Sequence, residues 1–177
     1  MLKDLGIESF VADTFYSLKA EDIHYHYNKP TLIHLNKDLG RPLFISCLVH
    51  GNEDAGLYAI QKVLEKYSKQ HSFIIFIGNP LAASKKQRHL ENQPDFNRIW
   101  SLENFEKYPM TEKLYNYVKE ANPIAVIDIH NTTGKNPHFS CINYKNSNTY
   151  KFASLFGGPI LFFKKPSTVL ALSLIHI

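Results

Sequence analysis

Three short segments of the chain consist almost entirely of apolar residues. They span residues 43–49 (LFISCLV), 73–77 (FIIFI) and 124–129 (IAVIDI). Unbroken apolar strands are typical of a parallel sheet whose two faces are both covered by helices. We therefore predict three buried strands at these positions.

Helical patterns separate these strands. Residues 54–69 place Ile60 and Leu64 on one face at helical spacing, with Asn52 as the expected N-cap, and a second helical pattern spans 102–120. Strands that alternate with helices predict an α/β fold with a mixed, mostly parallel sheet flanked by helices.

The two ends of the chain carry weaker patterns. Residues 23–27 (IHYHY) alternate like an edge strand, and 31–35 are expected to pair with them. Near the C-terminus, a helix at 147–156 is predicted between strands at 138–144 and 159–163. The chain has neither an internal repeat nor an interdomain linker in its sequence, so we expect one domain over residues 1–177.

Composition narrows the class of protein. The chain has 177 residues, 44% of them hydrophobic, and a formal net charge of +4 that results from 20 Lys and Arg, which are spread along it, and 16 Asp and Glu. This balance suits a small anionic substrate and indicates no nucleic-acid partner. Cys47 and Cys141 form no disulfide framework, and neither a secretory signal nor a membrane-spanning run is present. We expect a cytoplasmic protein with no membrane partner, and the sequence predicts no oligomeric state.

Polar residues follow each of the three apolar strands. His50-Gly51-Asn52-Glu53 follows the first, Asn79-Pro80 the second, and Asp128-Ile129-His130-Asn131 ends the third. In open α/β sheets, ligands bind beyond the carboxyl ends of the strands. If the strands are parallel, these residues meet at one edge.

His50, Glu53 and His130 are the candidate metal ligands. Two imidazoles and one carboxylate are a typical catalytic zinc set, because three protein ligands leave a coordination position open. The alternative for His50 is a strand-end histidine bonded to the backbone. Asp128 lies two residues before His130 and so on the same face of a strand, where it either orients that imidazole or caps a neighbouring backbone group.

The long polar loop 79–100 carries further candidates. Long loops beside a site are often functional. Arg98, next to Asn97, is suited to binding a carboxylate with two parallel hydrogen bonds, and Arg88 to stabilising an oxyanion. The alternative for each arginine is a solvated surface charge.

Taken in order, five motifs resemble the succinylglutamate desuccinylase/aspartoacylase family, which belongs to the wider zinc carboxypeptidase-like group. They are HGNE (50–53), NP (79–80), Arg88, DFNR (95–98) and DIHNTTG (128–134). The resemblance covers about residues 43–134. Gln93-Pro94 makes the stretch between Arg88 and Asn97 slightly longer than the family pattern.

The resemblance implies a site and an activity. It implies that His50, Glu53 and His130 bind one Zn²⁺ per chain, that Asn97 and Arg98 hold a substrate carboxylate, and that Arg88 polarises the scissile carbonyl. The implied enzyme is a zinc-dependent hydrolase that cleaves the amide bond of a small anionic N-acyl amino acid with metal-activated water.

The C-terminal part departs from the family pattern. Family members carry a general-base glutamate downstream of the third metal ligand, whereas this chain has no Asp or Glu after His130. The last residues, 172–177 (LSLIHI), resemble translated sequencing-adapter read-through. We therefore expect a truncated copy with a fold that is incomplete at its C-terminal side and a non-native tail at 172–177. The alternatives are a carboxypeptidase-like metallopeptidase, and a non-catalytic zinc-binding fragment or pseudoenzyme.

Overall fold

The computed structural model describes residues 4–132 and 134–175. Two compact units make up the chain. The first comprises residues 1–131 and 168–177, and the second comprises residues 132–167. The expected single catalytic domain over 1–177 stays a prediction.

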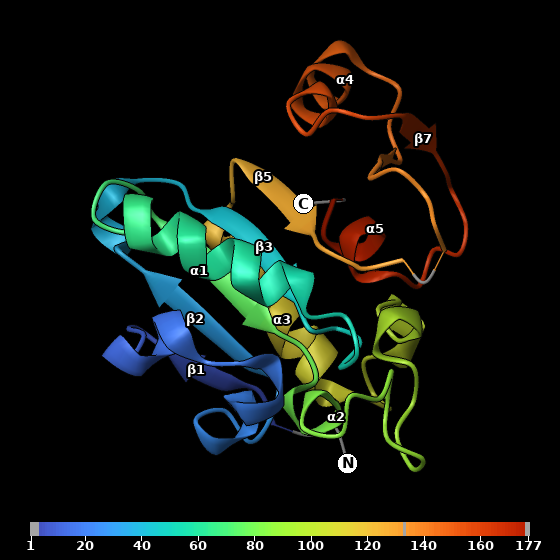
Figure 1. Cartoon of the computed structure of the whole chain (residues 1–177). Helices are drawn as coiled ribbons and strands as arrows, with labels where there is room; N and C mark the ends of the chain where they lie inside the picture. The colour runs from blue at the N-terminus through green and yellow to red at the C-terminus, as the bar shows by residue number, and fades with distance from the viewer. Residues whose placement is uncertain (1–3, 133, 176–177) are drawn as a thin grey trace. The chain divides into compact units, whose positions relative to one another are not determined.

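A five-stranded sheet forms the centre of the first unit (Figure 1). Its strand order is β1-β2-β4-β3-β5, and only the β2–β4 pair is antiparallel. The strands are β1 (Gly6–Glu8), β2 (Thr31–Leu35), β3 (Leu43–Cys47), β4 (Phe73–Ile77) and β5 (Ala125–Asp128). The prediction of an α/β fold with a mixed, mostly parallel sheet is therefore confirmed.

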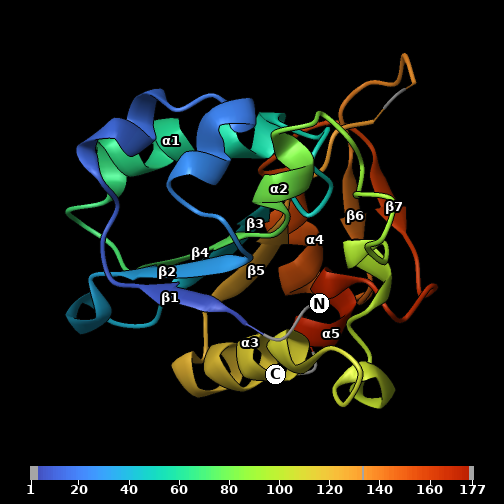
Figure 2. The ribbon, with the colours of Figure 1, turned by 90° about the horizontal axis from the view of Figure 1, so that it is seen from below.

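Helices cover both faces of this sheet. Side chains alternate along β4, so that Ile75 packs into one core with Ile60 and Leu64 of α1 (Ala55–Tyr67), whereas Phe76 packs into another. The second core contains residues of α3 (Pro109–Ala121) and α5 (Leu170–Ile175). Figure 2 shows α1 and α3 on opposite sides of the strands. This double coverage explains why FIIFI contains no polar residue.

The edge of the sheet differs from the prediction. Residues 23–27 form no strand, because Ala20–Tyr25 is the 3-10 helix η2, with Ala20 and Ile23 buried and Tyr25 77% exposed. A spacing of three residues between buried positions suits a 3-10 helix, in which side chains repeat every three residues. The partner of β2 at the edge is instead β1.

Two helix boundaries also differ. The predicted helix 102–120 divides into the short 3-10 helix η5 (Leu102–Asn104) and α3, which begins at Pro109. Proline suits the first turn of a helix and breaks its interior. Helix α1 is confirmed, but the residue at its N-cap is Asp54 rather than Asn52, and no side chain caps it.

The register aligns the carboxyl ends of three parallel strands. Cys47 in β3 pairs with Ile77 in β4, and Ser46 pairs with Asp128 in β5. The residues that follow these strands therefore meet at one edge, as the sequence predicts. Strand β5 lies at the side of the sheet and is only partly buried along its length, so the prediction of full burial is wrong for this strand.

The second unit has a strand–helix–strand arrangement. Strands β6 (Ser140–Ile142) and β7 (Ile160–Phe162) pair in parallel, and α4 (Ser147–Ser154) connects them, as predicted. Asn146 caps α4 by accepting a hydrogen bond from Thr149 N at 2.8 Å. Of the 172–177 segment, residues up to Ile175 belong to α5, while His176 and Ile177 lie outside the described residues. Across the described part of the chain, no helix is long and apolar enough to cross a membrane.

Candidate metal centre

The turn after β3 carries His50 and Glu53. Leu48, buried directly after the strand, has a left-handed φ of 51°, and its carbonyl accepts a hydrogen bond from Asn79 N at 2.7 Å. Gly51 packs directly against the short helix α2 (Pro80–Ala83). A Cβ built on Gly51 would lie 2.2 Å from Ala83 N. A glycine is therefore required for the turn to reach this position.

His50, Glu53 and His130 converge on one point. Glu53 Oε1 lies 2.8 Å from His50 Nδ1, and Glu53 Oε2 lies 2.6 Å from His130 Nδ1. One ligand atom from each residue lies within 4.8 Å of the other two. Two imidazole nitrogens and a carboxylate at this spacing fit a Zn²⁺ ion, whose ligand bonds are about 2.0–2.2 Å long.

The outer ring nitrogen of each histidine faces a carboxylate. His50 Nε2 lies 2.9 Å from Asp95 Oδ1, and His130 Nε2 lies 3.0 Å from Asp128 Oδ2. Carboxylates in this position fix the tautomer and the ring orientation of metal-binding histidines. Both Nδ1 atoms are therefore the nitrogens directed at the shared point. Ser46 Oγ donates to Asp128 Oδ1 at 2.6 Å, so the carboxylate that orients His130 is itself held in place.

The electrostatics of the cluster favour a cation. Burial raises the pKa of Glu53, but the hydrogen bonds from His130 and His50 outweigh it and lower the pKa to about 2. Burial lowers the pKa of His130, whereas the hydrogen bonds with Asp128 and Glu53 raise it to about 10. A protonated His130 thus balances the carboxylates around it when no metal is bound. A divalent ion would take over this role with release of the proton.

The three candidates in the loop 79–100 lie at different depths. Arg88, with its side chain 45% exposed, places Nη1 3.6 Å from Glu53 Oε1. Asn97 is buried, and its Nδ2 lies 3.2 Å from His130 Nε2 while its Oδ1 accepts from Leu170 N at 3.0 Å. Arg98 is exposed and donates from Nη1 to Asn97 O. The structure therefore brings Arg88 and Asn97 to the cluster, whereas the described contacts of Arg98 lie beside it.

Asp95 also belongs to this site, although the sequence patterns predict no role for it. It stands at the N-cap of the 3-10 helix η4 (Phe96–Arg98), where its Oδ1 accepts from Asn97 N at 2.8 Å. Its other contacts reach His50 and Arg88. An aspartate directly before a short helical turn predicts a cap, but its contact with His50, 45 residues earlier in the chain, depends on the fold.

Comparison with known proteins identifies the family. Residues 39–172 match the model of the succinylglutamate desuccinylase/aspartoacylase catalytic domain. The chain belongs to this family. The resemblance that the motifs between residues 43 and 134 predict is therefore confirmed, and the succinylglutamate desuccinylase/aspartoacylase family is one of hydrolases.

Solved structures of succinylglutamate desuccinylases share the fold. The enzyme from Vibrio parahaemolyticus has a TM-score of 0.61 at 17% identity, over 76% of this chain and 53% of that chain. The enzyme from Vibrio cholerae has a TM-score of 0.58 at 16% identity, over 76% and 46%. The enzyme from Chromobacterium violaceum has a TM-score of 0.62 at 18% identity, over 80% and 51%. The chain thus spans about half the length of these structures. A search of curated proteins found no match.

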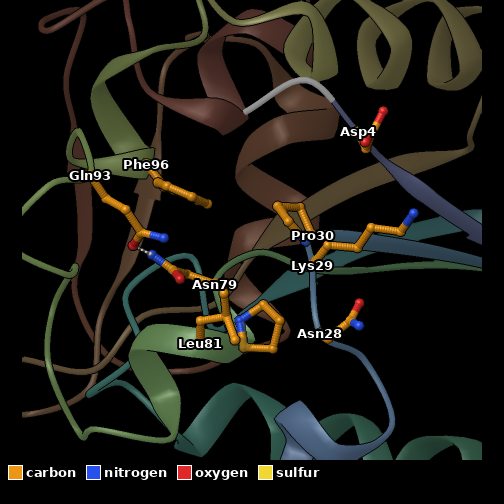
Figure 3. A pocket seen from close by; sticks show the side chains of 9 residues that line it. Asp4, Asn28, Lys29, Pro30, Asn79, Leu81, Gln93 and Phe96 are labelled. Carbon is orange, nitrogen blue, oxygen red and sulfur yellow. Dashed lines mark hydrogen bonds between the residues drawn. The ribbon is translucent and has the colours of Figure 1, made fainter. Parts of the chain in front are cut away.

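A cavity of about 190 Å³ is lined in part by Gln93 and Phe96 of the loop that carries Asp95. Figure 3 shows Gln93 hydrogen-bonded to Asn79 at one side of it, with Phe96 and Pro30 around the open space. None of His50, Glu53 and His130 lines this cavity. Residues of the family motif DFNR therefore face two ways: Asp95 contacts the histidine cluster, while Phe96 faces the cavity and the core.

Proposed function

We propose that this chain supplies the zinc-binding part of a hydrolase that cleaves the amide bond of N-acyl amino acids, such as N-succinylglutamate or N-acetylaspartate. The observation that carries the proposal is the convergence of one ligand atom each from His50, Glu53 and His130 within 4.8 Å in a chain of this family. The position of the three residues after parallel strands, with His50 and Glu53 buried and His130 partly buried, supports it, because preorganised ligands bind a metal without first having to be ordered.

His50, Glu53 and His130 would hold one Zn²⁺ per chain. When bound, the ion would act as a Lewis acid and lower the pKa of a water molecule, which supplies the nucleophile for amide hydrolysis. Asp128 keeps the His130 ring turned so that Nδ1 faces the site, and Asp95 does the same for His50. Glu53 is ionised at neutral pH, since its pKa lies at about 2.

The loop residues would bind the substrate. Arg88 is partly exposed and lies beside Glu53, so its guanidinium is suited to stabilising the negative charge that develops on the scissile carbonyl oxygen. Arg98 is exposed and would hold the substrate carboxylate with two parallel hydrogen bonds. Asn97 Nδ2 lies beside His130, whose Nε2–H donates to Asp128, so the two N–H groups on Nδ2 are the donors that we assign to the substrate carboxylate.

A second candidate is a zinc-binding domain without catalysis. It is favoured by the composition of residues 131–177, which contain no Asp or Glu to act as the general base. On either proposal the 177-residue chain binds zinc, but on the second it turns over no substrate. On the first proposal we expect slow turnover by this chain. Its free cysteines Cys47 and Cys141 suit the reducing cytoplasm, where we propose that the protein acts.

Metal analysis of the purified protein tests the zinc site. We expect one zinc per wild-type chain and loss of that zinc in His50→Ala and in His130→Ala, with His26→Ala, at an exposed histidine, as the control that retains it. Wild-type protein that binds no zinc after saturation and desalting would contradict the proposal. Release of glutamate from N-succinylglutamate or aspartate from N-acetylaspartate then separates the two candidate functions.

A further inference from the structure

Asp95 connects three groups of the site through one carboxylate. Its Oδ1 accepts from His50 Nε2 at 2.9 Å and from Asn97 N at 2.8 Å. Its Oδ2 accepts from Arg88, with Nη2 at 2.9 Å and Nε at 3.2 Å. The Asp95 side chain is 23% exposed, so solvent and salt screen these interactions less than they screen surface ion pairs.

Arg88 lies between two carboxylates of the site. Two of its nitrogens bond Asp95, whereas its Nη1 is 3.6 Å from Glu53 Oε1, which is longer than a hydrogen bond. Paired bonds from a planar guanidinium fix both its position and its plane. Asp95 therefore decides how closely Arg88 approaches Glu53, and Glu53 is one of the three residues assigned to the metal.

Arg88 and a metal ion compete for the same carboxylate. A guanidinium that bonded Glu53 directly would occupy an oxygen that the metal needs, and its positive charge would repel a divalent cation at short range. With Arg88 held by Asp95, the Glu53 oxygens stay directed at the two histidines. The same arginine stays close enough to act on a substrate beside the metal.

We propose that Asp95 is a positioning residue that couples metal binding to the placement of Arg88, an inference that rests on the zinc site proposed above. Asp95 stabilises the bound metal in two ways. It fixes the tautomer of His50 through Nε2, and it keeps Arg88 from pairing with Glu53. Loss of its charge therefore weakens zinc binding twice, and the second loss depends on the presence of Arg88.

A double-mutant cycle in zinc affinity tests this coupling. The variants are D95N, R88M and D95N/R88M, measured by competition with a chromogenic chelator and checked for folding by circular dichroism. We expect D95N to bind zinc about 10- to 100-fold more weakly than the wild type, since a carboxylate beside a ligating histidine has an effect of this size. R88M should strengthen zinc binding at least about fivefold more in the D95N background than in the wild type.

Two controls separate the inference from general charge effects. D38N changes the net charge by the same amount at an exposed residue of the 3-10 helix η3 (Lys37–Leu39), and we expect wild-type zinc affinity there. D95E keeps the charge, so R88M should change the zinc affinity of D95E no more than that of the wild type. If D95N does not fold, D95S, which also lacks the carboxylate, replaces it in the cycle with the same expected outcomes.

The outcomes distinguish this inference from the proposed function. An R88M effect that is equal in the wild type and in D95N, within about twofold, overturns the coupling. Unchanged zinc affinity in D95N overturns the role of Asp95 altogether while leaving the zinc site intact. Wild-type protein that binds no zinc overturns the proposed function instead. Because affinity is measured directly, none of these results depends on whether the 177-residue chain turns over substrate.

Discussion

Replacing Gly51 with alanine tests whether the turn after β3 depends on close packing against α2. A Cβ at this position would lie 2.2 Å from Ala83 N, 2.3 Å from Ala82 C and 2.7 Å from Ala82 Cβ. Ordinary contacts of this kind begin near 3.4 Å, so either the turn or α2 must move by about 1 Å. All three neighbours are backbone or Cβ atoms, which a change of side-chain rotamer does not relieve.

The expected cost lies at the upper end of the range for overpacking. We expect Gly51→Ala to lower the free energy of unfolding by about 3 kcal/mol, because overpacked sites typically lose about 1–3 kcal/mol and these contacts involve rigid atoms. For a chain of this length the melting temperature should fall by about 6–12 °C. Zinc affinity should fall as well, since His50 and Glu53 flank the displaced residue. Urea denaturation and chelator competition measure the two effects.

Gly40→Ala is the matched control. A Cβ there meets nothing within 4 Å, but the φ of +96° strains any other residue, so the variant reports backbone strain without a clash. We expect it to cost about 1–2 kcal/mol and to leave zinc affinity unchanged. If Gly51→Ala unfolds within about 0.5 kcal/mol of the wild type and retains its zinc affinity, the close approach of the turn to α2 is not a requirement of the site.

Four further predictions follow from the chemistry of single groups. In the metal-free protein, the pKa of His130 is raised to about 10, so its contribution to stability is present below its unfolded-state pKa of 6.5 and is lost as the pH rises toward 10. Urea denaturation at pH 6 and pH 10 should show this loss in the wild type and not in His130→Ala. The pKa of Glu53 is lowered to about 2, so its contribution is present above 4.5 and lost as the pH falls toward 2. Zinc binding at pH 7.5 should release about one proton, from His130, and calorimetry in buffers of different ionisation enthalpy detects this release. A binding enthalpy that is independent of the buffer would contradict this prediction. Cys47 is buried, which raises the pKa of its thiol, whereas Cys141 is exposed. A thiol reagent should therefore label one cysteine in the native chain and two after denaturation. Rapid labelling of both cysteines in the native state would refute the burial of Cys47.

The sequence predicts the parts of the structure that depend on local patterns. An apolar run such as FIIFI indicates a strand buried on both faces wherever it lies, and the position of His50 and His130 after such strands predicts that they meet. The segment IHYHY shows the limit of this reasoning. Its alternation suits a strand, but the burial of Ala20 and Ile23 at a spacing of three residues selects a 3-10 helix.

Contacts between distant parts of the chain are the features that sequence patterns do not predict. The contact between Asp95 and His50 joins residues 45 positions apart, and its presence depends on how the loop 79–100 folds back over the turn after β3. Asn97 is a similar case. Its place beside Arg98 in the sequence suggests a shared role, whereas the structure buries Asn97 against His130 and leaves Arg98 exposed.

The reversed direction of β2 determines which parts of the N-terminal region can influence the site. Thr31 pairs with Ile77, so residues 28–30 lie at the same edge of the sheet as Asn79, where they help to line the cavity. Leu35 pairs with Phe73, so the connection from residue 36 to residue 42 lies at the opposite edge. Insertions before β2 would therefore alter the approach to the metal edge, whereas insertions after β2 would lengthen the chain at a distance from it.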